Sequence, residues 1–208
     1  MEQSRFKQGG FTIIEMMVAV LVMLVLIAIA QPSFESLRQR SAIRGSAEHL
    51  LSFWNQARLE AAKRNQFVKV GVVQSDSGKT FCLGAATTTD PNDTTPCDCT
   101  EPAPSTDVCD VAIFPGQGNN SEWRGVELTG MTLGGGTVIT AIQPAVIEPK
   151  RTNLIVPDDD GSITISSPAG RWNYRVNLLV DRFGRGVLCE STSASDQLSD
   201  YGTRRCAP

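Results

Sequence analysis

The hydrophobic pattern of the chain changes twice, and its first part is a long apolar run. From Ile13 to Ala30 every position is apolar except Glu15. A helix of about 18 apolar residues can cross most of the roughly 30 Å hydrocarbon core of a bilayer. The pattern therefore predicts a transmembrane segment, which we place at residues 11–31.

Beyond this run the pattern becomes amphipathic. Apolar residues recur at spacings of three and four, and charged residues largely fill the opposite face. Asn65 is a suitable residue to end a helix. We therefore expect one helix over residues 11–65, whose second half packs on a folded domain. The apolar positions of that half are Phe34, Leu37, Ala47, Leu50, Leu51, Trp54, Ala57 and Ala61.

Residues 66–208 lose the helical period and contain short β-rich runs between turn residues. Many strands after a single helix predict an α+β protein, in which an antiparallel sheet packs against the second half of the helix. The expected strands are Phe67–Val73, Thr80–Leu83, Val111–Phe114, Val126–Leu128, Thr137–Ile142, Asn153–Val156, Ser162–Ser166, Tyr174–Val180 and Gly186–Cys189.

All six cysteines lie in this second part. An even number confined to one domain predicts disulfides and an oxidising compartment. A zinc site is disfavoured, because the Cys-x-Cys spacing at Cys97 and Cys99 is not the usual one. We expect these two residues not to pair with each other, and each to pair with Cys82 or Cys109. Which of the two pairings forms stays open at this point.

The remaining two cysteines are Cys189 and Cys206, which we expect to bond to each other. The stretch between them is polar and has few apolar groups to hold it down. A bridge would pin this stretch to the last strand, and closing a loop of this size is worth about 3 kcal/mol in the chain-entropy model.

The charges flanking the apolar run predict its orientation. Arg5 and Lys7 precede it, against Glu2. By the positive-inside rule this end stays in the cytoplasm, and the cysteine-bearing domain lies outside. The periplasm of a Gram-negative bacterium satisfies both inferences. The net charge of −3 and the pI near 5.2 give no overall basic field, so nucleic-acid binding would need a local basic patch.

The N-terminal segment has a second interpretation. A basic start, an apolar run and Ala28-Ile29-Ala30 also fit a secretory signal peptide. Glu15 counts against it, because an acidic side chain at mid-helix costs about 2.5–3.5 kcal/mol on insertion scales. A disposable signal has no use for such a residue. We therefore favour a functional intramembrane charge that has a partner.

The string Gly9-Gly10-Phe11-Thr12-Ile13-Ile14-Glu15 resembles the prepilin peptidase recognition site of type IV pilins and type II secretion pseudopilins. The resemblance implies that residues 1–10 are a leader removed after Gly10, and that the new amine of Phe11 is methylated. Glu15 would then neutralise the amine of a neighbouring subunit, or its own. The implied partners are prepilin peptidase, other pilins or pseudopilins, and an inner-membrane assembly platform.

Two further features match this family. The string QARLEAAKRNQ at residues 56–66, running into Phe67, is similar to the hallmark of the GspH/FimT minor pseudopilins and minor pilins, which have a β-sandwich-like globule. Pro32 stands where pilins often carry proline. It removes the helical bond to Ala28 and disfavours helix at Gln31. Pro32 would therefore produce either a simple kink in the helix or a weak point at which the helix unwinds in the filament.

No catalytic constellation or cofactor site is apparent in the sequence, and we expect no enzyme. His49 is the single histidine, so neither a metal triad nor a Ser-His-Asp triad can be assembled. Asp158-Asp159-Asp160-Gly161 invites a calcium interpretation, which stays open. The spacing of an EF-hand is absent, and a hairpin turn at Asp160-Gly161 is the simpler interpretation.

Some competence-associated FimT-like pilins bind DNA through a C-terminal Gly-Arg-x-Arg motif. Gly184-Arg185-Gly186 and Gly202-Thr203-Arg204-Arg205 only approach this motif, and acidic residues lie nearby. The candidate DNA contacts are Arg185, Arg204 and Arg205, for which solvated surface arginines are the alternative.

The sequence thus predicts a minor pilin or pseudopilin in, or at the tip of, a periplasmic type IV pilus filament. A type II secretion minor pseudopilin and a DNA-binding minor pilin for natural transformation are the alternatives.

Overall fold

The computed structural model describes residues 10–75, 80–93, 95–99, 108–115, 126–133, 145–156, 160–168, 170, 172–192, 194–198, 201 and 206. They form one helix and nine strands. In chain order these are α1 (Ile13–Arg64), β1 (Phe67–Ser75), β2 (Thr80–Thr88), β3 (Ala112–Phe114), β4 (Glu127–Met131), β5 (Ala145–Ile147), β6 (Leu154–Val156), β7 (Gly161–Ser166), β8 (Arg175–Val180) and β9 (Gly186–Glu190). The chain divides into two compact units, Met1–Arg38 and Gln39–Pro208.

The end of α1 follows from local backbone chemistry. Asn65 takes a left-handed conformation with a φ of 52°, which asparagine tolerates better than most residues. The amide of Gln66 donates to the carbonyl of Ala61 at 3.3 Å, the bond expected of a Schellman motif. The helix therefore ends beside Asn65, and the chain enters β1 two residues later.

The strands of the second unit form two antiparallel sheets. One has five strands in the order β3-β2-β1-β5-β6, and the other has four in the order β4-β7-β8-β9. The longest pairing joins β1 to β2, from Phe67 opposite Thr88 to Ser75 opposite Thr80. A register shift between Leu128 and Gly130 marks a bulge in β4.

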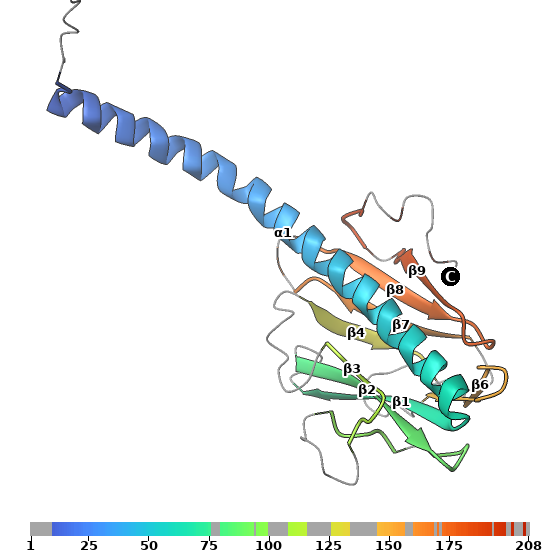
Figure 1. Ribbon diagram of the computed structural model, residues 1–208. Coiled ribbons are helices and arrows are strands. Elements are labelled where there is room, and N and C mark those ends of the chain that lie inside the picture. The colour runs from blue at the N-terminus through green and yellow to red at the C-terminus, as the bar shows by residue number, and fades with distance from the viewer. Residues whose placement is uncertain are drawn as a thin grey trace, which may run out of the picture. The chain divides into compact units, whose positions relative to one another are not determined.

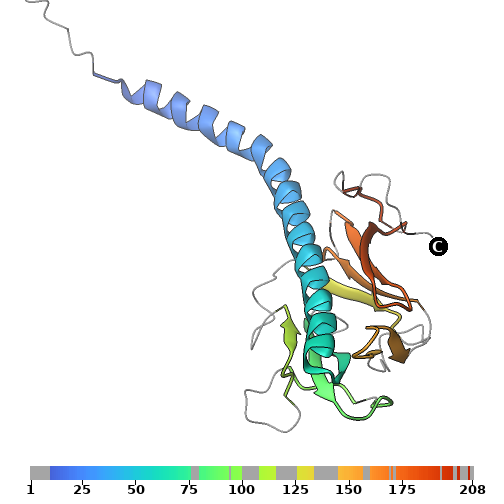
Figure 2. The same ribbon diagram turned by 45° about the vertical axis from the view of Figure 1, so that its right-hand side comes forward.

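The second half of α1 lies across both sheets (Figure 1 and Figure 2). One face of the helix is fully buried at spacings of three and four residues, the period of an amphipathic helix. The indole of Trp54, at its centre, donates to the carbonyl of Gly184 at 2.8 Å. This core joins the helix to both sheets. The buried helical positions are Ile43, Ala47, Leu50, Trp54, Ala57 and Ala61.

The α+β class, with a long N-terminal helix followed by antiparallel sheet, is confirmed. The amphipathic face is confirmed only from Ala47 onward, because Phe34 and Leu37 are exposed and lie in the first unit. Most expected strands are present. β5 was not expected, and the strand expected at Thr137–Ile142 lies outside the described residues.

The hairpin expected at Asp160-Gly161 is wrong. The strands before and after it, β6 and β7, belong to different sheets, so this turn carries the chain from one sheet to the other. The amide of Arg182 donates to Asp160 Oδ1 at 2.9 Å. A Cβ on Gly161 would press on Leu133. Local turn composition cannot distinguish a hairpin from a crossing of this kind. Asp158 and Asp159 lie outside the described residues.

Candidate processing and assembly site

Gly10 and Phe11 lie just before α1 and are exposed. The side chain of Phe11 is 78% exposed, and a Cβ built on Gly10 would meet no atom within 4 Å. Local packing therefore gives no reason for glycine at this position. In the described part of the chain, the backbone at Gly10 is therefore open to contact by a second molecule.

Thr12 caps the start of α1. Its hydroxyl accepts a hydrogen bond from the amide of Glu15 at 3.3 Å, and its carbonyl accepts the first helical bond, from Met16. Thr-x-x-Glu is the capping-box spacing, and an acidic residue in the first turn also complements the helix dipole. The fold thus places the Glu15 carboxylate in the first turn of α1, four residues after Phe11.

The apolar run is exposed on all sides of the helix. Every large apolar side chain from Ile13 to Ile29 is exposed, from 46% at Ile27 to 83% at Ile13. Judged by length and composition, α1 is one helix in the described part of the chain that could cross a membrane. Helical structure continues through Pro32 in the single subunit.

The polar residues of the 56–66 string connect the end of α1 to two separate loops, one before β3 and one before β6. Gln56 Nε2 donates to the carbonyl of Val111 at 3.1 Å. Arg58 Nη2 donates to Thr152 Oγ1 at 3.0 Å. These bonds do more than terminate a helix, since they fix its rotation on the sheets.

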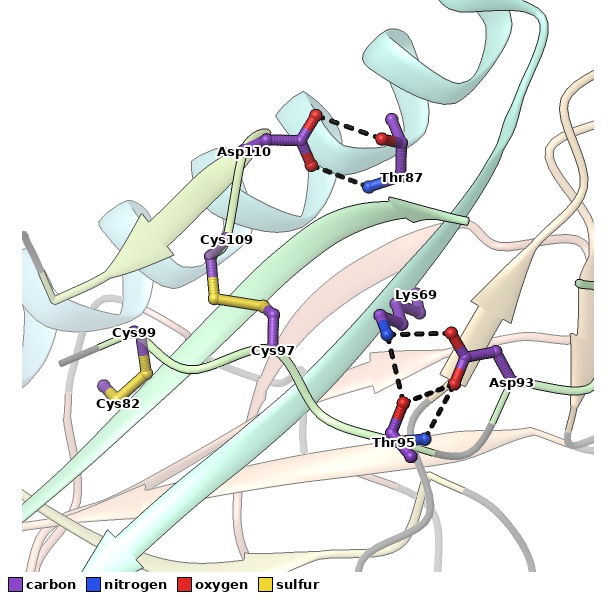
Figure 3. Close-up of a disulfide and its surroundings, with 9 residues drawn as sticks. All are labelled: Lys69, Cys82, Thr87, Asp93, Thr95, Cys97, Cys99, Cys109 and Asp110. Carbon is purple, nitrogen blue, oxygen red and sulfur yellow. Dashed lines mark hydrogen bonds and ion pairs between the residues drawn. A yellow bond between two sulfur atoms is a disulfide. The ribbon is translucent and has the colours of Figure 1, made fainter. Parts of the chain in front are cut away.

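Arg64 makes the third connection, an ion pair of 2.6 Å with Asp110. Asp110 also accepts from the amide of Thr87, at 2.8 Å, and from its hydroxyl (Figure 3). Sequence reasoning missed Asp110, because an aspartate next to a cysteine gives no signal of its distant partners.

Two disulfides lie on the face of β2 that points away from α1. Cys82 is bonded to Cys99, and Cys97 to Cys109. The four cysteines and Ala86 form a small buried cluster of their own. Figure 3 shows both bridges side by side above the strands.

A partly buried ion pair holds the start of the same loop. Lys69 Nζ lies 2.8 Å from Asp93 Oδ2, and the two side chains are 14% and 20% exposed. Burial alone would raise the pKa of Asp93. Hydrogen bonds from Lys69, Thr95 and Thr88 outweigh it and hold that pKa well below its usual range.

The structure also joins Cys189 to Cys206. The stretch between them is better anchored than its composition indicates. Leu198 is only 2% exposed, and its amide donates to the buried carboxylate of Glu190 at 2.7 Å. Tyr201 packs against the main core. A single leucine in a polar stretch gives little signal in the sequence, yet it forms part of the core.

Whether the candidate DNA contacts Arg185, Arg204 and Arg205 form a cluster stays untested. Arg185 lies in the turn before β9. Cys206 is bonded to Cys189, which follows Arg185 by four residues in the chain. At about 3.3 Å per residue this is roughly 13 Å along the strand, so the bridge by itself does not bring the chain end to Arg185. Arg204 and Arg205 lie outside the described residues.

His49 packs on the ring of Phe114, and the described residues contain no group of three side chains suited to a metal ion.

Comparison with known proteins gives one match to a family and one to a structure. Residues 5–31 match the prokaryotic N-terminal methylation motif. The chain therefore carries this motif, with Gly10, Phe11 and Glu15 inside it. No curated protein sequence matches the chain. The crystal structure of the type IV minor pilin FimU of Pseudomonas aeruginosa strain PAO1 is similar, at 13% sequence identity and a TM-score of 0.45, over 73% of this chain and 91% of FimU.

Proposed function

We propose that this protein is a minor pilin, a structural subunit that prepilin peptidase processes and that assembles into, or at the tip of, a periplasmic type IV pilus filament. The observation that carries the proposal is the exposed Gly10-Phe11 bond directly before a capped, apolar helix with Glu15 in its first turn. The methylation motif over residues 5–31 supports the same assignment.

The chemistry of the segment explains each step. Cleavage after Gly10 creates an ammonium at Phe11, at the edge of the membrane. Glu15 supplies the opposite charge in an apolar setting, where an unpaired ion is costly. Pairing with the amine of a neighbouring subunit makes both charges tolerable and sets the stagger between subunits. Unwinding of α1 near Pro32 during packing is part of the proposal, because proline lacks one helical bond.

The location follows from charge and redox chemistry. Arg5 and Lys7 keep the N-terminus in the cytoplasm. The three disulfides support an oxidising compartment, the periplasm, for residues 66–208. The subunit is then a single-pass protein of the bacterial inner membrane until an assembly platform transfers it to the filament.

Intact mass and N-terminal peptide sequencing of the purified mature protein test this proposal. The expected mature chain begins with N-methyl-Phe11. Gly10→Leu is expected to keep the leader attached, because the enlarged residue blocks the peptidase. A mature chain that begins at Gln31 would restore the signal-peptide interpretation and overturn the proposal.

Type II secretion is the alternative machine for such a subunit. The cysteine-rich domain and its C-terminal bridge favour the pilus. Deleting the gene is therefore expected to reduce surface pili and to leave secretion of exoproteins unchanged. The reverse result would identify a minor pseudopilin instead.

DNA binding is a second candidate function, and one observation favours it. Arg182 and Arg185 both lie against the exposed ring of Phe183, at 5.1 and 5.8 Å from its centroid. Exposed Lys150 and Arg151 lie in the turn before β6. The first residue of β6, Leu154, donates through its amide to the Arg182 carbonyl at 3.0 Å. Cations around an exposed aromatic ring are the elements that bind single-stranded nucleic acid.

Fluorescence anisotropy with a labelled single-stranded oligonucleotide tests this second candidate. Arg182→Ala with Arg185→Ala is expected to weaken binding and to lower the salt slope by about 1.4. Phe183→Ala is expected to weaken binding through lost stacking. Lys63→Ala, which removes an exposed cation on α1, is the control. Equal effects of all variants, or no binding by the wild-type protein, would refute DNA binding at this turn.

A further inference from the structure

Two of the three disulfides interleave along the sequence. Cys82 pairs with Cys99 and Cys97 with Cys109, so each bridge closes a loop that contains one end of the other bridge. Cys189 and Cys206 have no cysteine between them. If the domain is exported as proposed above, its cysteines reach the periplasm in sequence order. Oxidation of each cysteine with the next would form one native bridge and two wrong ones.

Chain entropy does not select the native pairing. Four cysteines allow three pairings. The consecutive one, Cys82–Cys97 with Cys99–Cys109, closes loops that are each two residues shorter than the native loops. Because loop closure depends only on the logarithm of loop length, this difference favours the wrong pairing by less than about twofold. An unfolded chain therefore populates both pairings.

The folded sheet distinguishes the native cysteine pairing from the consecutive one. All four cysteine side chains are at most 5% exposed, on one face of β2. Gly84 lies directly beneath the Cys97–Cys109 bridge, and a Cβ there would overlap both sulfur atoms. Figure 3 shows this bridge lying over the strands. Such packing exists only after β1, β2 and β3 have paired, so it cannot guide a bridge that forms before then.

A mispaired chain also has no means of correcting itself. The protein has six cysteines, and none of them is free. Exchange between disulfides begins with attack by a thiolate. Once the four cysteines are bonded wrongly and Cys189 is bonded to Cys206, the chain contains no thiolate. The attacking group has to come from another molecule.

We propose that folding of this domain requires a periplasmic thiol–disulfide isomerase as a partner. Its thiolate attacks Cys97 Sγ of the wrong Cys82–Cys97 bridge, forms a mixed disulfide and releases the Cys82 thiolate. That thiolate attacks Cys99 Sγ, which forms Cys82–Cys99 and releases the Cys109 thiolate. The Cys109 thiolate then attacks Cys97, forms Cys97–Cys109 and regenerates the isomerase thiolate. No electrons are gained or lost overall.

The native bridges are at most 5% exposed once they have packed on β2. The isomerase therefore acts on the exported but incompletely folded domain. The filament subunit needs no such partner afterwards, because its two interleaved bridges are buried.

The test is expression of the full-length chain in two matched strains, with and without the periplasmic isomerase. Free thiols are blocked at lysis, and the bridges are mapped by non-reducing peptide mass spectrometry. Without the isomerase, the fraction with Cys82–Cys99 and Cys97–Cys109 is expected to fall at least threefold, and Cys82–Cys97 is expected to accumulate. Cys189–Cys206 is expected to form equally in both strains and serves as the internal control.

A variant with Cys97→Ser and Cys109→Ser supplies a matched control. It leaves Cys82 and Cys99 as consecutive cysteines, so their bridge is expected to form in both strains. Equal native pairing of the wild-type chain in both strains would overturn the isomerase requirement and leave the proposed function intact. Absence of Cys189–Cys206 from both strains would instead overturn the periplasmic location, and this inference with it.

Discussion

Arg64 Nη1 lies 2.6 Å from Asp110 Oδ2, and this ion pair connects the end of α1 to the residue after Cys109. The two side chains are 37% and 40% exposed, so the charge interaction is well screened by solvent. Asp110 has a second role, because its carboxylate also accepts from the amide of Thr87.

The two partners are therefore expected to differ in their effect on stability. Asp110→Ala is expected to lower the free energy of unfolding by about 1 kcal/mol, since the Thr87 amide loses its acceptor. Arg64→Ala is expected to have the smaller effect. Denaturant unfolding of the full chain in detergent, followed by intrinsic tryptophan fluorescence, measures both. A larger effect of Arg64→Ala would contradict this division of roles.

Glu15→Gln is expected to leave the subunit in the membrane and out of filaments. Removing the charge makes insertion easier, but the Phe11 amine loses its partner. Leaving one charge of a buried pair alone costs about 3 kcal/mol or more, which is roughly a hundredfold in assembly. Quantifying the subunit in purified filaments and in membranes measures the effect. Glu35→Gln, in the same helix beyond the apolar run, is the control, and equal assembly of both variants would contradict the pairing.

Asp93→Asn is expected to destabilise the domain by about 2 kcal/mol near neutral pH, because the hydrogen bonds to a charged group are lost. The pKa of Asp93 is lowered in the folded state. Its contribution is therefore fully present above the ordinary aspartate pKa of about 3.9 and is lost as the pH falls below it. The difference in free energy of unfolding between wild type and Asp93→Asn should stay at about 2 kcal/mol from pH 5 to pH 7. It should shrink below about pH 4.

Unfolding curves at several pH values test this expectation. Asp90→Asn is the matched control in the same loop, where the Asp90 side chain accepts from the amide of Asn92 at 2.9 Å. If the difference in free energy of unfolding between wild type and Asp93→Asn stays constant down to pH 3, the Lys69–Asp93 pair does not lose its contribution in acid, and the expectation is refuted.

Gly184→Ala is expected to destabilise the domain by about 1–3 kcal/mol. Gly184 has a φ of 73°, and a Cβ there would overlap the carbonyl of Thr152. Its own carbonyl accepts from Trp54, so a shift of this turn would also disturb the core. Thermal unfolding measures the change. Gly170→Ala, where a Cβ would meet Pro168 O at 3.8 Å and no other described atom within 4 Å, is expected to be neutral. Equal stability of the two variants would refute the conformational requirement at Gly184.

The features that the sequence determined by itself are those with local causes. The apolar run, the helix end at Asn65 and the alternation in β7 and β8 depend on neighbouring residues. Hydrophobic burial and backbone preference act on each segment separately, so these elements can be derived from the sequence pattern. The methylation motif is also local, since it lies within residues 5–31.

Only the tertiary structure decided which distant groups meet. β6 and β7 are neighbours in sequence yet belong to different sheets. Cys97 could have paired with Cys82 or with Cys109, and loop lengths differ too little to choose between them. The pairing of β1, β2 and β3 places Cys97 over Gly84, next to Cys109. Contacts of this kind depend on the simultaneous packing of several strands, for which no single segment carries a signal.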